Sequence, residues 1–203
     1  MPVWQKLYEE LKDSNFVVIT VAMDKTAADA RPWIEAAKPT HTSLIDAQHL
    51  VADLYNMVNV PTIVWIDEEG RVARPNDVAF GQDTFKALTG IDSAKHLDAL
   101  RAWVRGEAPS MTPDNVRSLR SSPTRQDQEA RAEFGLAFWL YERGRNEAAE
   151  RHFLRGGELA PHDFMIRRGS LPMRGIDPMG PEFAKMLMEW EAAGNSYYLQ
   201  LPY

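Results

Sequence analysis

Apolar positions follow two different periods along this chain. Within residues 1–105, stripes with helical spacing alternate with short, nearly continuous apolar runs. The clearest runs are 16–23 (FVVITVAM) and 63–67 (IVWID). Such β-branched runs predict strands that are buried on both faces of a parallel sheet. The first half is therefore predicted to be an α/β domain in which helices connect parallel strands.

Other elements of this half follow from the same patterns. Helices are expected over 2–12, 26–38, 50–58 and 93–105, a short strand at 43–45 and an antiparallel return strand at 71–74. Asp24, Asp46 and Asp67 each follow a predicted strand. Carboxylates at such positions can bind metals or catalyse reactions, but helix capping and turn formation explain these three better. Asp46 is expected to cap the helix that follows it.

The second half carries helical patterns alone. Helices are expected over 126–143, 147–159 and 181–193. A stretch rich in proline and serine precedes them and is typical of a linker. The sequence thus predicts a domain at 1–107, a linker at 108–125 and a helical region at 126–203.

Composition narrows the possible chemistry. The 203 residues carry a net charge of −6 without a long basic run, so nucleic-acid binding is not expected. There is no cysteine, and no apolar run has the roughly 20 residues needed to span a bilayer. The five histidines are scattered without metal-ligand spacing, and no phosphate-binding glycine loop is present. No metal and no cofactor are therefore expected, and aromatic and methionine residues such as Trp139 and Met188 are assigned to cores.

Three segments occur in an order that resembles a known family. They are MPVWQKLYEELKDSNFVVITVAMD (1–24), LIDAQHLVADLYNMVNVPTIVWIDEEG (44–70) and the closing helix near 93–105. Together they resemble the TlpA/ResA-like redoxins of the thioredoxin superfamily. The resemblance implies a thioredoxin-like fold and a role in thiol–disulfide exchange or cell redox homeostasis. It also implies a protein or peptide substrate that carries thiols or a disulfide.

Val60, Pro61 and Thr62 are the most informative part of this resemblance. In the family the equivalent proline is cis and lies beside the reactive disulfide, where the preceding backbone pairs with an extended substrate. The resemblance therefore makes these three residues the candidate substrate-binding site, with Pro61 expected in the cis form. The simpler alternative is that Pro61 ends a helix and begins a strand.

The chain departs from the family at its start. The family's Cys-x-x-Cys motif and the strand before it would fall upstream of Met1, so no catalytic residue is assigned and the status as an enzyme stays open. That strand lies centrally in the family, between the strands matching 16–23 and 63–67. Three explanations are open: the sequence begins late, another segment such as 197–203 or another subunit supplies the strand, or the flanking strands rearrange. The compartment is cytoplasmic if the chain is complete and exported if a signal segment has been lost.

Residues 130–163 resemble one tetratricopeptide repeat. Leu136 and Ala137 fall in its first helix, Gly144 at its turn, and Ala149 and Phe153 in its second helix. The expected fold is thus a thioredoxin-like α/β domain lacking its first strand and Cys-x-x-Cys, followed by an all-α, repeat-like region. The helices are either a hairpin packed for stability or a surface that binds a protein partner. In the second case the whole chain is a non-catalytic binding module.

Overall fold

The chain divides into two compact units whose boundaries cut across the sequence. The computed structural model describes residues 2–108, 111–120, 122–198 and 201. The first unit comprises 1–47, 61–120 and 199–203, and the second comprises 48–60 and 121–198. Segment 48–60 thus belongs with the helices of the second half. The predicted domains 1–107 and 126–203 remain a proposal.

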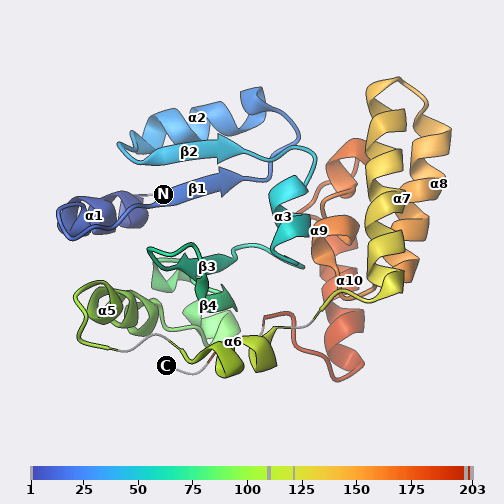
Figure 1. Cartoon of the computed structure of the whole chain (residues 1–203). Helices are drawn as coiled ribbons and strands as arrows, with labels where there is room; N and C mark the ends of the chain where they lie inside the picture. The colour runs from blue at the N-terminus through green and yellow to red at the C-terminus, as the bar shows by residue number, and fades with distance from the viewer. Residues whose placement is uncertain (1, 109–110, 121, 199–200, 202–203) are drawn as a thin grey trace. The chain divides into compact units, whose positions relative to one another are not determined.

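The first unit alternates helices and short strands (Figure 1). Its elements are α1 (Pro2–Leu11), β1 (Ile19–Ala22), α2 (Ala27–Ala37), β2 (Thr42–Ile45), β3 (Ile63–Ile66), β4 (Val72–Asp77), the 3-10 helix η1 (Asp83–Phe85), α4 (Lys86–Thr89), α5 (Ser93–Val104) and α6 (Pro113–Leu119). These bounds confirm the predicted helices near 2–12, 26–38 and 93–105 and the antiparallel return strand. Helix α6 lies inside the stretch predicted to be a linker.

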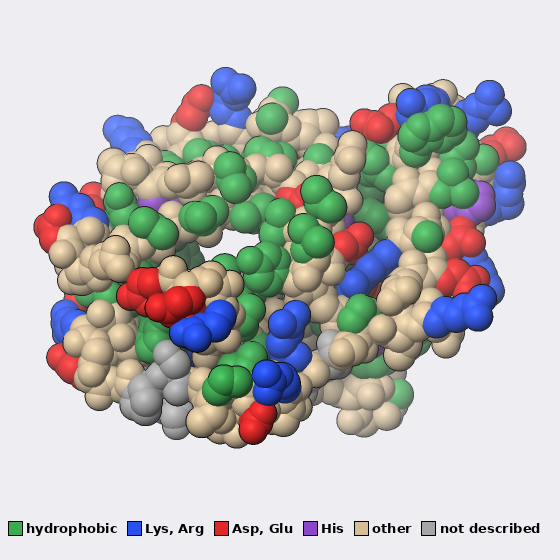
Figure 2. Space-filling view, in the orientation of Figure 1, with side chains coloured by type: hydrophobic (Ala, Val, Ile, Leu, Met, Phe, Trp, Pro, Cys, Tyr) green, Lys and Arg blue, Asp and Glu red, His purple; other side chains and the backbone are tan. Residues whose placement is uncertain are grey.

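The strands form two separate pairs. Strand β1 runs parallel to β2, and β3 runs antiparallel to β4. In the described part of the chain no strand joins β1 to β3, so each of them is paired along one edge only. Figure 2 shows an opening, bordered by hydrophobic side chains, where β1 and β3 run apart in Figure 1. The pairing agrees with the expectation that the sheet lacks its middle strand.

The missing neighbour also corrects the expected burial of 16–23. Only 19–22 form the strand, and Val17 and Ile19 are 72% and 58% exposed. A strand is covered when neighbours pair along both edges and helices pack on both faces. Because β1 pairs along one edge only, its apolar side chains stay in contact with solvent.

The core of the first unit forms around Trp65 of β3. Leu7 and Leu11 project from the same face of α1, as their spacing of four predicts, and both are almost fully buried. Leu100 of α5 joins them, and Trp103 stacks on Trp65 with ring centroids 5.2 Å apart. Each buried leucine contributes about 1.5–3 kcal/mol. The apolar stripes of α1 and α5 therefore act as predicted.

A buried ionic cluster lies beside this core. Arg74 Nε is 2.8 Å from Asp77 Oδ2, and His96 Nδ1 is 3.4 Å from the same oxygen. Burial favours the protonated acid, but hydrogen bonds from His96 and Arg74 outweigh it and lower the pKa of Asp77 to about 2. The cluster also holds Leu201: its N–H donates to Asp77 Oδ1 at 3.4 Å, and Arg74 Nη2 donates to its carbonyl at 3.2 Å.

The second unit is helical and is organised around one hairpin. Its elements are α3 (Leu50–Leu54), α7 (Arg125–Glu142), α8 (Asn146–Leu159), α9 (Phe164–Arg167), the 3-10 helix η2 (Leu171–Arg174) and α10 (Pro181–Ala192). Helices α7 and α8 lie side by side (Figure 1). Ala137 and Ala149 are buried where they pack, and Phe153 contacts Phe134 edge-on. Gly144 makes the turn with φ of +69°.

The hairpin confirms the predicted helices within about one residue at each end, whereas its membership of a repeat family remains a proposal. Two side chains assigned to cores lie elsewhere: Trp139 is 48% exposed and Met188 is 63% exposed. The guanidinium of Arg143 lies over the Trp139 ring at 3.9 Å. Their helical spacing was therefore a misleading sign of burial.

The helix expected over 50–58 is shorter and faces differently. Helix α3 ends at Leu54, and the left-handed backbone of Asn56 (φ +51°) prevents its continuation. Leu50 and Leu54 are 62% and 70% exposed. The residue before the helix is His49, so the expectation that Asp46 caps it is wrong.

Two further observations bear on earlier expectations. Among the described residues of 197–203, Tyr197, Tyr198 and Leu201 are not in a strand, so they do not replace the missing one. No helix in the described part of the chain combines the length and apolar character needed to cross a membrane.

The ionic cluster gives a prediction for the first unit. Replacing Asp77 with Asn leaves Arg74 buried without its carboxylate and should lower the free energy of unfolding by about 3 kcal/mol at pH 7. Because the folded-state pKa of Asp77 is depressed, its stabilisation is present above about pH 4 and is lost as the pH falls through about 2. Urea denaturation, monitored through the hydrogen exchange of first-unit amides, measures the decrease in the free energy of unfolding.

The matched control is Asp98→Asn, which removes an exposed carboxylate paired with Arg101 on α5. It should change stability by less than about 0.5 kcal/mol. Equal effects of the two substitutions would show that the Asp77 cluster is not stabilising.

Candidate functional site

The three residues singled out by sequence lie together directly before β3. Val60, Pro61 and Thr62 are partly buried, and the boundary between the two units falls between Val60 and Pro61. The structure thus brings Val60 into the second unit, through segment 48–60. The cis form of Pro61 stays a prediction.

Helix α9 holds the backbone of this segment at Val58. The N–H groups of Phe164 and Met165 both donate to the Val58 carbonyl, at 2.7 and 3.1 Å. Amides at the start of a helix have no partner within the helix, so they are available to bind another carbonyl. The first turn of α9 is therefore an anchor for the chain before Pro61.

The C-terminal segment holds the next two residues. Asn59 Nδ2 donates to the Tyr197 carbonyl at 2.6 Å, and the Tyr198 hydroxyl donates to the Val60 carbonyl at 3.1 Å. The Tyr197 ring packs edge-on against Phe164, with centroids 4.6 Å apart. The carbonyl of Val60, expected to meet a substrate, is thus already a hydrogen-bond acceptor within the chain.

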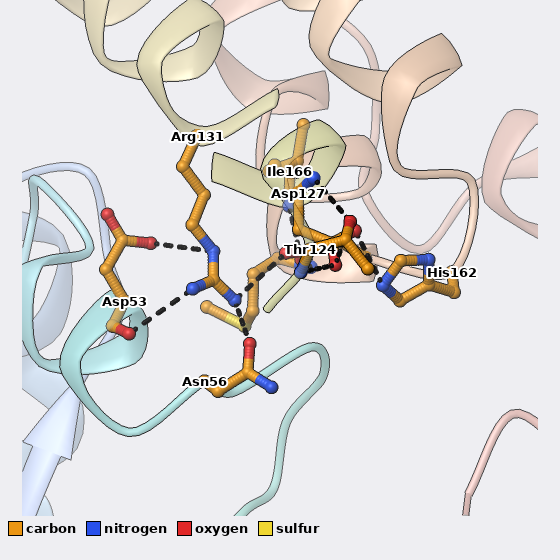
Figure 3. Close-up of polar contacts among 9 residues, drawn as sticks. Asp53, Asn56, Thr124, Asp127, Arg131, His162 and Ile166 are labelled. Atoms are coloured by element: carbon orange, nitrogen blue, oxygen red, sulfur yellow. Dashed lines mark hydrogen bonds and ion pairs between the residues drawn. The ribbon is translucent and has the colours of Figure 1, made fainter. Parts of the chain in front are cut away.

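Arg131 of α7 fixes the start of the same segment (Figure 3). Its Nη1 donates to the Asp53 carbonyl at 3.3 Å, and its Nε is 3.4 Å from Asp53 Oδ1. Its Nη2 donates to Asn56 Oδ1 at 2.5 Å. The guanidinium is largely buried, so these contacts are better protected from water and salt than a surface ion pair. They hold the residues that follow α3 against α7.

Asp163 lies behind this contact, almost completely buried at the start of α9. Its Oδ1 accepts the N–H groups of Met165 and Ile166, at 3.0 and 3.2 Å. Burial raises the pKa of Asp163 to about 6, although Arg131, 3.8 Å away, and the two amides oppose the shift. Asp163 therefore caps α9 and is at the same time a buried titratable group.

His49 completes the packing of the segment. Its ring stacks on Phe134 of α7, with centroids 4.7 Å apart, and its backbone is left-handed (φ +60°). A Cβ on Gly169 would lie 2.0 Å from the Met165 carbonyl and 3.0 Å from His49 Cε1. Position 169 therefore accepts only glycine, because any side chain would displace this backbone.

The described polar contacts of this site are hydrogen bonds and ion pairs within the chain. Among residues 2–108, 111–120, 122–198 and 201, no group of three or more histidines and carboxylates could hold a metal ion. Asp67, one of the three carboxylates that follow predicted strands, stabilises a turn as expected. Its Oδ1 accepts the N–H groups of Glu69 and Arg71. The described hydrogen bonds position residues 58–60.

Sequence reasoning missed Arg131, Asp163 and Tyr198. Asp163 carried a usable signal, since an aspartate directly before the apolar residues 164–166 fits a helix cap. Arg131 and Tyr198 carried none, because their partners lie 75 and 138 residues away.

Asp163 gives a prediction for the second unit. An acid whose pKa is raised on folding binds protons more tightly when folded, so this unit should gain stability as the pH falls from about 6 to 4. The gain is about 3 kcal/mol, since each pKa unit corresponds to about 1.4 kcal/mol. Asp163→Asn keeps the capping oxygen and removes the titration. As the pH falls from 7 to 4, the urea midpoint of α7–α8 should rise more for the wild type than for Asp163→Asn. Parallel curves for the two proteins would contradict the raised pKa of Asp163.

Comparison with known proteins gives one match. Residues 1–74 match the model of a family described as AhpC/TSA. The match covers 74 of the 203 residues and indicates that this part is similar to the thioredoxin-like redoxins, a family with thiol-based redox function. No curated protein and no solved structure matched the chain. The matched residues include Val60, Pro61 and Thr62 and end within β4.

Proposed function

We propose that this chain is the substrate-binding part of a TlpA/ResA-type thioredoxin-like protein that acts in thiol–disulfide exchange. Val60, Pro61 and Thr62 hold an extended thiol or disulfide peptide, and the reactive thiols come from outside residues 1–203. The single observation that carries this proposal is the family match at 1–74 in a chain with no cysteine.

The pairing of the strands supports the same proposal. Strands β1 and β3 are each paired on one edge only within the described residues, as expected if the strand that bears the thiols is not among them. Unpaired strand edges expose N–H and C=O groups that readily pair with another strand. A segment carrying cysteines and inserted between β1 and β3 would therefore complete the sheet and lie near Pro61.

The chemistry requires this division of roles. In thiol–disulfide exchange a thiolate attacks a disulfide sulfur and forms a new S–S bond, while the other sulfur leaves as a thiolate. None of the 203 residues can supply that thiolate. The contribution of this chain is to orient the substrate backbone before Pro61, which brings the disulfide to the thiols of the other segment.

The native gene product tests the proposal. With dithiothreitol as reductant it should reduce insulin faster than dithiothreitol alone, and alkylation with iodoacetamide should abolish the difference. Pro61→Ala should lower the rate at least several-fold because the substrate backbone loses its orientation. Pro113→Ala, at the exposed start of α6, is the matched control and should have no effect. A native product with an intact mass of 23.0 kDa and no alkylatable thiol would contradict the redox role.

A second candidate function is a non-catalytic module that binds a protein through its helices. It is favoured by the exposed apolar side chains of the hairpin: Leu136 and Trp139 on α7 and Leu154 on α8 are 44–48% exposed. Surface apolar residues of this kind can mark an interface when they form a patch. The insulin assay separates the two functions, because a binding module gives no thiol-dependent activity.

A further inference from the structure

The segment before Pro61 already carries an occupant from its own chain. Three consecutive residues there are bound within the second unit: Val58 by the first amides of α9, Asn59 by the Tyr197 carbonyl, and Val60 by the Tyr198 hydroxyl. The contacts at Asn59 and Val60 both come from one dipeptide. Tyr197 and Tyr198 therefore contact the Asn59 side chain and the Val60 backbone as a bound peptide would.

The chemistry of these contacts defines what the surface recognises. Asn59 offers an N–H to a peptide carbonyl, and Val60 offers a carbonyl to a donor one residue further along the bound chain. The Asn59 side chain is buried, which protects its hydrogen bond to the Tyr197 carbonyl from water. The Phe164 ring, which the Tyr197 ring contacts edge-on, provides an apolar contact for an aromatic side chain of the bound peptide. This combination fits a peptide segment that contains tyrosine.

Burial keeps the Tyr198 contact available over the working pH range. It raises the pKa of the phenol above its ordinary value, so the hydroxyl remains a hydrogen-bond donor at neutral and mildly alkaline pH. The Tyr197 and Tyr198 rings also contact each other at 4.4 Å, which orients the hydroxyl toward Val60.

We propose that Asn59 and Val60 form a docking site for a tyrosine-containing peptide, and that Tyr197 and Tyr198 occupy this site in cis. A peptide partner then has to displace the chain's own C-terminal segment. This inference rests on the proposed function only in so far as Val60 is a peptide-binding residue. It adds the class of ligand and the group that competes with it.

A fluorescein-labelled synthetic peptide, NSYYLQLPY, with the sequence of residues 195–203, tests the proposal by fluorescence anisotropy. Binding should be at least about fivefold tighter to full-length Tyr198→Phe than to the wild type, because one net hydrogen bond of about 1 kcal/mol no longer competes. Tyr8→Phe, which removes a phenol from α1 in the first unit, is the matched control and should bind like the wild type.

A chain ending at Ser196 gives a second measure, and it should bind the peptide more tightly still. If this truncated chain does not fold, Tyr198→Phe decides alone. A peptide with phenylalanine at the second tyrosine should bind the truncated chain about fivefold more weakly. Equal peptide affinity for wild type and folded Tyr198→Phe, or no binding to either, would overturn the proposal.

This test is independent of the redox proposal because it uses no thiol. Peptide binding without insulin reduction by the native product would leave the docking site standing and remove the exchange function. Insulin reduction by the native product, together with equal peptide affinity of the wild type and Tyr198→Phe, would support the exchange function and remove the docking site.

Discussion

The guanidinium of Arg131 is the contact on which the organisation of the second unit depends. It reaches from α7 to the Asp53 carbonyl and carboxylate and to Asn56, and its other neighbour is the buried Asp163. A largely buried cation is stabilising only when its hydrogen bonds are made, so α7 and the end of α3 must stay together. This requirement draws segment 48–60 into the helical unit, although the surrounding sequence belongs to the α/β half.

The position of segment 48–60 links the fold to the proposed function. The backbone ahead of Pro61 is held by α9 at Val58 and by Tyr198 at Val60. Tyr197 and Tyr198 contact the residues for which we propose a peptide-binding role. Under the proposal that Val60 binds a peptide, the Tyr198 hydroxyl competes with that peptide for the Val60 carbonyl.

Local patterns were enough to predict much of the fold. The stripes of α1, α5, α7 and α8 placed these helices correctly. The strands of the described residues form two separate pairs, as the order of the segments led us to expect. Patterns failed where burial depends on distant partners. Strand β1 was expected to be buried, but it lacks a second neighbour, and Leu50 and Leu54 face solvent while His49 packs on Phe134. Of the candidate site, the sequence indicated Val60, Pro61 and Thr62, but not the groups that bind them.

Native-state hydrogen exchange of residues 50–58 tests the central claim that this segment is held by the helical unit. In the wild type these amides should open with the same free energy as those of α7. Arg131→Met should speed their exchange at least about tenfold while β3 is unchanged, whereas Arg143→Met, which removes a guanidinium from the exposed Trp139 ring on α7, should leave them unchanged. Exchange of 50–58 in step with β3, insensitive to Arg131→Met, would contradict the account.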